Sequence, residues 1–138
     1  MTDQRSAGSA PIEPATVYAR IGGEAGVRRL TGRFYALMDE LPDAAACRAI
    51  HPSSLEESEQ KLFEFLTGWF GGPQLFVERR GAPMLRQRHM IAEIGPAETD
   101  GWLLCFRQAL AETVADADIR EAILPQVEKL AHHMRNRA

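Results

Sequence analysis

The apolar residues of this chain recur at intervals of three and four from Thr16 onward, and this spacing constrains the fold more than any other feature. Such intervals place the apolar side chains along one side of a helix. No stretch alternates apolar and polar residues for long enough to predict a strand of a half-buried sheet. The sequence therefore predicts an all-α fold with four substantial helices and shorter helices between them.

Glycine, proline and capping residues divide this pattern into segments. We expect a short helix over residues 17–21, a long one over 24–41, and one or two short turns over 44–50. The next helix ends at the Gly-Gly-Pro segment 71–73. It is expected to begin at one of two capping boxes: Ser53 with Glu56, or Ser54 with Glu57.

The second half of the chain is expected to be helical again after one loop. Residues 74–82 are expected to form that loop, and Pro83 is expected in the first turn of a short helix that holds His89. A long helix is expected to begin at Pro96. The final helix is expected to begin with a cap at Asp118.

The length and the N-terminal segment predict one domain with a tail. A chain of 138 residues is long enough for one ordinary domain and too short for two. Residues 1–15 have no apolar period and are expected to be a flexible tail, followed by a domain over 16–138. Neither a membrane-spanning run of about 20 apolar residues nor the apolar core of a secretory signal peptide is present. We therefore expect a cytoplasmic protein.

Charge and cysteine content exclude several classes of partner. The net charge of −3 argues against a surface that binds nucleic acid or an anionic membrane. Cys47 and Cys105 lie far apart, outside any CxxC arrangement, and do not predict a disulfide framework or a zinc site. We expect both to be small buried apolar residues.

His89 is the most informative of the four histidines. On its own, a histidine with apolar neighbours is more often a hydrogen-bonded core residue than a metal ligand. Here Arg86 and Arg88 flank it, and two other helices are rich in aromatic residues. Haem needs an axial nitrogen, an apolar slot and cations for its propionates, for which Arg88 is the first candidate. No P-loop, dinucleotide fingerprint, HExxH or GxSxG motif favours another site.

Five segments, in order over most of residues 16–137, together resemble the truncated haemoglobins, specifically group II. They are YARIGGE at 18–24, FY at 34–35, FLTGWFGGP at 65–73, LRQRH at 85–89 and GWL at 101–103. The specific combination is GGP after an aromatic pair, then the LRxRH segment, then a downstream tryptophan.

This resemblance implies a two-over-two helical sandwich around haem b. It implies that O2, and other diatomic ligands such as NO or CO, bind reversibly at an open iron position opposite a proximal histidine, His89. The residues implied to contact haem are Leu62, Phe65, Leu85, Arg88, His89 and Trp102. Those implied in the distal ligand pocket are Tyr35, His51, Ser58, Leu62 and Trp102. Ser58 stands where familiar haemoglobins place a distal histidine, so Tyr35, His51 and Trp102 must supply the hydrogen bonds to the ligand.

Two other functions stay open at this point. Slow O2 release would favour scavenging, sensing or redox chemistry over transport, and the haem could support NO dioxygenation or peroxidase turnover. Because the chain has no flavin or nicotinamide domain, such turnover needs an external reductase. The other possibility is a cofactor-free helical interaction domain. The sequence leaves open whether the protein is a monomer or a homodimer, and whether iron has an internal sixth ligand.

Overall fold

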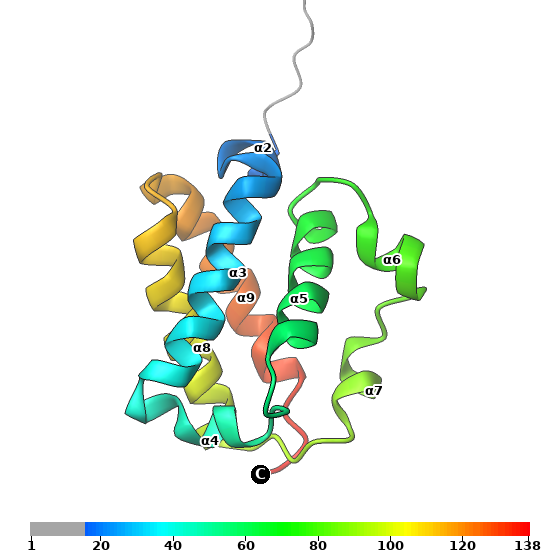
Figure 1. Ribbon diagram of the computed structural model, residues 1–138, viewed down its shortest axis with the longest axis vertical. Helices are drawn as coiled ribbons and strands as arrows, with labels where there is room; N and C mark the ends of the chain where they lie inside the picture. Colours follow the sequence, from blue (N-terminus) through cyan, green and yellow to red (C-terminus); the bar gives the residue numbers. More distant parts are fainter. Residues whose placement is uncertain (1–15) are drawn as a thin grey trace, which may run out of the picture.

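The computed structural model describes residues 16–138, and this part of the chain is helical without any strand (Figure 1). Its helices are α2 (Val17–Arg20), α3 (Gly23–Glu40), the 3-10 helix η1 (Pro42–Ala44), α4 (Ala45–Ala49), α5 (Glu56–Trp69), α6 (Leu75–Arg80), α7 (Leu85–His89), α8 (Pro96–Thr113) and α9 (Ala117–His133). The expected all-α class, with four long helices, is confirmed. The tail expected over residues 1–15 lies outside the described residues. None of the described helices has the length and apolar character needed to cross a membrane.

Helices α3 and α8 form the centre of the fold. α3 packs against both α8 and α5, and α8 also packs against α4 and α9. Phe34 of α3 is fully buried, with its ring centroid 5.0 Å from that of Trp102 and 6.0 Å from that of Phe106 on α8. In Figure 1, α3 and α8 lie on the left of the molecule, and the green segment from α5 to α7 lies on the right. Edge-on aromatic contacts therefore join the two central helices.

A close contact between backbones fixes the start of α3. A Cβ atom at Gly26 would lie 1.9 Å from the carbonyl oxygen of Ile21, at the end of α2. Only glycine permits the two helices to approach this closely. The backbone N–H of Tyr18 also donates to the carbonyl of Phe70 at 2.9 Å, which attaches α2 to the end of α5.

Two expected helix caps are wrong. α5 begins at Glu56 without a side-chain cap, and Ser54 Oγ only accepts the N–H of Glu56 at 3.4 Å, so no reciprocal capping box forms. α9 is capped by Asp116 rather than Asp118. Asp116 Oδ1 accepts the N–H groups of Asp118 and Ile119, at 3.0 and 3.3 Å, because a cap must precede the N–H groups that it satisfies.

The segment between α5 and α7 also differs from expectation. Residues 75–80 form the helix α6 instead of the expected loop. A helix this short does not show a periodic pattern of apolar residues in the sequence. Its contact with α5, described below, stabilises it. Pro83 lies outside α7. The helix instead follows Met84, whose backbone is left-handed, with φ of 40° and ψ of 51°. This conformation is unfavourable for a side chain with a Cβ atom.

Candidate cofactor-binding site

His89 is the last residue of α7, and one of its two ring nitrogens makes a hydrogen bond to the backbone of the same helix. Its Nδ1 atom lies 2.6 Å from the carbonyl oxygen of Leu85, and the ring is exposed. A carbonyl oxygen only accepts hydrogen bonds, so Nδ1 carries the proton and Nε2 of the neutral ring carries a lone pair. No hydrogen bond within residues 16–138 uses Nε2. This is the arrangement in which a histidine can act as a metal ligand.

Tyr35 of α3 is a buried residue, and its hydroxyl group makes no hydrogen bond to the other described residues. The side chain is 7% exposed, and its ring centroid lies 4.7 Å from that of Phe34 and 6.0 Å from that of His51. Burial raises the pKa of the hydroxyl group, so the group stays protonated. Tyr35 therefore provides a donor beside His51 that can bind a polar ligand.

His51 follows α4 and has a fixed tautomer of its own. Its Nδ1 atom lies 2.8 Å from the carbonyl oxygen of Cys47. Burial lowers the pKa of His51, as does the charge of Arg48, although the hydrogen bond to the Cys47 carbonyl opposes this. The neutral ring therefore donates through Nδ1 and presents Nε2 as an acceptor.

Trp102 of α8 joins Tyr35 through Phe34. Its ring is half-buried and stacks on Phe106, with the centroids 5.3 Å apart and the planes 4° apart. Its indole N–H makes no hydrogen bond to the rest of the described chain. Contacts through Phe34 therefore link Trp102 to Tyr35, which in turn contacts His51, although these residues are far apart in sequence.

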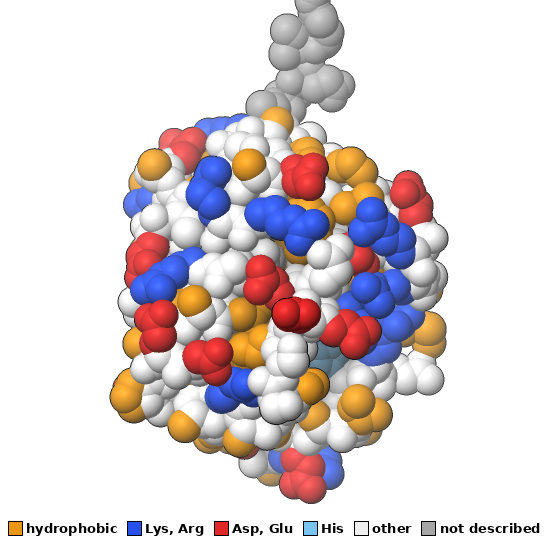
Figure 2. Space-filling view, in the orientation of Figure 1, with side chains coloured by type: hydrophobic (Ala, Val, Ile, Leu, Met, Phe, Trp, Pro, Cys, Tyr) orange, Lys and Arg blue, Asp and Glu red, His pale blue; other side chains and the backbone are white. Residues whose placement is uncertain are grey.

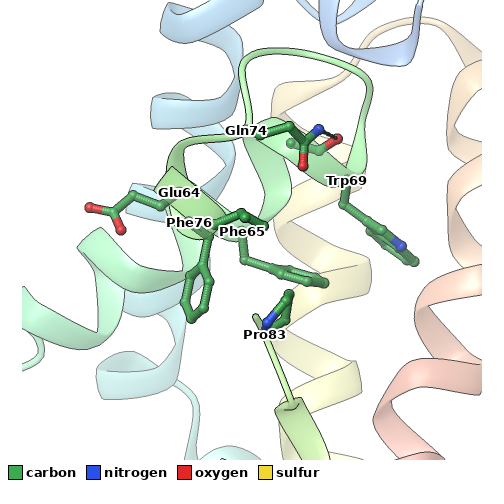
Figure 3. Close-up of a pocket in the computed structure, with 8 residues that line it drawn as sticks. Glu64, Phe65, Trp69, Gln74, Phe76 and Pro83 are labelled. Atoms are coloured by element: carbon green, nitrogen blue, oxygen red, sulfur yellow. Dashed lines mark hydrogen bonds between the residues drawn. The ribbon is translucent and has the colours of Figure 1, made fainter. Parts of the chain in front are cut away.

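The predicted contact residues of α5 form a half-buried face. Ser58 and Leu62 stand one helical turn apart, and Phe65 follows, with its ring stacked on Trp69 at 5.8 Å between centroids. Figure 2 shows histidine atoms recessed between α5 and α7, among acidic and basic side chains. Phe65 also lines a cavity of about 250 Å³ (Figure 3). The other principal lining residues are Glu64, Trp69, Gln74, Phe76 and Pro83.

Glu64 is a residue that the sequence analysis missed. Its side chain is 2% exposed, and its carboxylate accepts from Arg80 Nε at 2.6 Å and Arg79 Nη1 at 3.1 Å. Burial alone would raise its pKa, but the hydrogen bonds from Arg80, Gln60 and Arg79 lower the pKa to about 2. The basic run beside His89 is thus partly neutralised by a buried anion, and this ion pair attaches α6 to α5.

Arg88, the predicted propionate partner, makes hydrogen bonds to the backbone. Its Nη2 atom donates to the carbonyls of Arg80 and Ala82, each at 3.0 Å, and its guanidinium lies 5.2 Å from the ring centroid of Phe76. Leu85 is half-buried and accepts the His89 hydrogen bond described above. The roles of Arg88 and Leu85 toward a cofactor remain predictions.

Comparisons with known proteins identify the family. Residues 16–136 match the family described as bacterial-like globin. The chain is 56% identical to a group II 2-on-2 hemoglobin from the plant pathogen Agrobacterium tumefaciens. The two structures agree with a TM-score of 0.91, over 94% of this chain and 100% of that one. The chain belongs to the group II truncated haemoglobins.

Two further relatives are similar to this truncated haemoglobin. Group 2 truncated hemoglobin YjbI of Bacillus subtilis (strain 168) is 36% identical over 119 residues, which are 86% of this chain and 87% of the relative. A solved structure described as a truncated oxygen-avid haemoglobin from Bacillus subtilis is 35% identical, with a TM-score of 0.80. That match covers 88% of this chain and 100% of the other. The resemblance expected from the five sequence segments is confirmed.

Membership of the globins implies that this truncated haemoglobin binds haem, and the chemistry of its residues fits that cofactor. The lone pair of His89 Nε2 is the ligand type that haem iron takes from globins. The half-buried side chains of Leu62, Phe65 and Trp102 offer apolar contact area for a porphyrin ring. The Tyr35 hydroxyl group is a donor placed among apolar residues, as the binding of a small polar ligand requires.

Proposed function

We propose that this truncated haemoglobin holds haem b through Nε2 of His89 and binds O2 reversibly on the opposite side of the haem, near Tyr35, His51 and Trp102. One observation carries the proposal: the hydrogen bond of 2.6 Å from His89 Nδ1 to the Leu85 carbonyl. This bond orients the imidazole, fixes its tautomer and makes Nε2 a better electron-pair donor.

Haem supplies a ferrous iron atom that binds O2 and other diatomic ligands such as NO and CO. The chain supplies the surroundings that decide how long the ligand stays. The hydroxyl of Tyr35 and the indole N–H of Trp102 have no other acceptors in the described chain and donate to the ligand. A hydrogen bond to a charged acceptor contributes about 1.5–3 kcal/mol, and about 1.4 kcal/mol is a factor of ten in affinity. Avid binding is also what the oxygen-avid relative from Bacillus subtilis supports.

His51 acts differently from the other two polar residues. The neutral ring donates to the Cys47 carbonyl, so its Nε2 atom accepts rather than donates. The Tyr35 ring lies 6.0 Å away between centroids, so the His51 ring helps to position the tyrosine hydroxyl group. Ser58 and Leu62 complete the distal pocket, while Phe65, Leu85 and Arg88 contact the haem, with Arg88 toward a propionate.

The test replaces the ligand to iron and restores it from solution. His89→Gly, reconstituted with hemin, is expected to lose the absorption bands of the histidine-bound ferrous and CO forms and to regain them when imidazole is added. His133→Gly is the matched control, because His133 is likewise the exposed last residue of a helix. Unchanged spectra in His89→Gly would reject the assignment of His89.

A further inference from the structure

The helix that bears His89 is not positioned by apolar packing. No residue of α7 is buried, and α7 packs closely against no other described helix. The methionines on either side, Met84 and Met90, are 56% and 55% exposed. Since burial of apolar area is the usual force that fixes a helix in a fold, another interaction must hold the direction of the His89 ring.

The side-chain amide of Asn136 makes three hydrogen bonds to the segment that ends α7. Its Nδ2 atom donates to the carbonyl of Ala92 at 2.9 Å and to that of His89 at 3.4 Å. Its Oδ1 atom accepts the N–H of Ile94 at 2.9 Å. One side chain thus uses both its donor and its acceptor on the backbone of residues 89–94.

Asn136 is itself attached to the core. It follows the C-terminus of α9, where Met134 is buried and its N–H donates to the carbonyl of Leu130 at 3.2 Å. The backbone N–H groups of Asn136 and Arg137 donate to the carbonyl of Ile94, at 2.9 and 3.0 Å, and Ile94 is 7% exposed. The amide therefore connects an anchored chain end to a segment with little packing of its own.

We propose that Asn136 is a positioning residue for His89, acting through the backbone of residues 89–94. The inference rests on the proposed function, in which His89 binds the haem. The His89 ring is held by its hydrogen bond to the Leu85 carbonyl, and the backbone carbonyl of His89 accepts a hydrogen bond from Asn136. Loss of the amide releases residues 89–94 and widens the range of directions that Nε2 of His89 adopts.

The experiment compares Asn136→Ala with Arg135→Ala in the full chain loaded with haem. Arg135 is the matched control because its side chain makes no hydrogen bond or ion pair in the described chain, while its carbonyl, which accepts from Arg86 at 3.2 Å, is retained. In Asn136→Ala we expect haem transfer to an excess of an acceptor protein to become about tenfold faster, as loss of about 1.4 kcal/mol implies. We also expect the iron–histidine stretching band to shift or broaden. Arg135→Ala should match the wild type.

A second variant separates the two halves of the amide. Asn136→Asp keeps an acceptor for the N–H of Ile94 but places a carboxylate, which cannot donate, against the carbonyls of His89 and Ala92. We expect it to show the same loss of haem retention and the same band change. It serves as the test if Asn136→Ala does not fold.

Amide hydrogen exchange of the protein without haem tests the same contacts independently of the ligand assignment. Residues 85–94 are expected to exchange about tenfold faster in Asn136→Ala than in Arg135→Ala. A lower unfolding midpoint with an unchanged iron–histidine band and unchanged haem transfer would make Asn136 purely structural and overturn the inference. Failure of the proposed function is recognised separately, from unchanged spectra in His89→Gly.

Discussion

Different forces hold the two sides of the candidate site. On the α3–α8 side, Phe34 is fully buried and its ring contacts those of Tyr35, Trp102 and Phe106. On the α6–α7 side, α6 is attached by an ion pair to the buried Glu64 and by the buried ring of Phe76, and α7 is attached by hydrogen bonds to backbone carbonyls. The first side stabilises the whole fold, whereas the second positions one segment.

This difference has a physical consequence for each class of substitution. Aromatic packing is spread over many weak contacts, so its loss lowers the stability of the whole domain. Hydrogen bonds at an exposed segment are few and local, so their loss changes local opening before it changes global unfolding. Substitutions in the aromatic packing should therefore alter global stability, whereas substitutions in the hydrogen bonds of α7 should alter local opening.

The largest expected effect is on the aromatic side. Phe34→Ala leaves a cavity between α3 and α8 and should lower the free energy of unfolding by about 4 kcal/mol, measured by urea titration of the protein without haem. Met90→Ala is the control, because Met90 follows α7 and is 55% exposed. It should change stability by less than about 0.5 kcal/mol. Equal losses in the two variants would contradict the contrast between the two sides.

The next effect concerns the ion pair that attaches α6 to α5. Glu64→Gln removes the buried charge and should lower stability by about 2 kcal/mol at pH 7. The folded-state pKa of Glu64 is lowered from 4.5 to about 2, so its stabilisation is fully present above the unfolded pKa. It is lost as the pH falls from about 5 toward 2.

The pH dependence provides the decisive comparison for Glu64. The difference in unfolding free energy between wild type and Glu64→Gln should therefore shrink as urea titrations are repeated from pH 7 down to pH 3. Glu57→Gln is the control, because Glu57 is 74% exposed and forms only a surface pair with Lys61 at 3.5 Å. A difference that does not depend on pH would show that the carboxylate charge contributes nothing.

A smaller effect tests whether the aromatic side also supplies the ligand's hydrogen bond. Tyr35→Phe keeps the buried ring and removes only the hydroxyl group, so the haem-loaded protein should release O2 about tenfold faster in stopped-flow measurements. Tyr18→Phe, on α2, should leave the rate unchanged. The role of Tyr35 as a donor is rejected if both variants release O2 at the wild-type rate.

The smallest effect concerns the backbone at the start of α7. Met84 has φ of 40°, which is unfavourable for any residue with a Cβ atom, and its side chain is 56% exposed. Met84→Gly should therefore raise the free energy of unfolding by about 0.5–1 kcal/mol, measured by urea titration. Met84→Ala removes the same side chain but keeps the Cβ atom, and it should give no gain.

The fold class and the long helices could be predicted because apolar spacing directly records which side of a helix is buried. Helix α8 begins at Pro96, as expected, since proline fits the first turn of a helix. Helix α6 could not be predicted, because the contacts of Arg79 and Arg80 with Glu64 bridge 15 and 16 residues. Capping was also ambiguous: Asp116 and Asp118 are both suitable residues, and only the backbone decides between them.

The candidate site divides in the same way. His89 was selected by its basic and apolar neighbours, and Tyr35 and Trp102 by the resemblance of their segments to a family. Asn136 carried no signal, because its partners lie 42–47 residues away in sequence. A polar residue just after the last predicted helix is indistinguishable from a solvated chain end.

The hydrogen bond between His89 and Leu85 closes a single turn at the end of a five-residue helix. It exists only while that turn is helical, because uncoiling would separate the imidazole from the carbonyl. The helical order of α7 and the electron-pair donation of His89 Nε2 are therefore linked. A cosolvent that uncoils this turn would reduce the electron-pair donation of His89 Nε2 without acting on the imidazole directly.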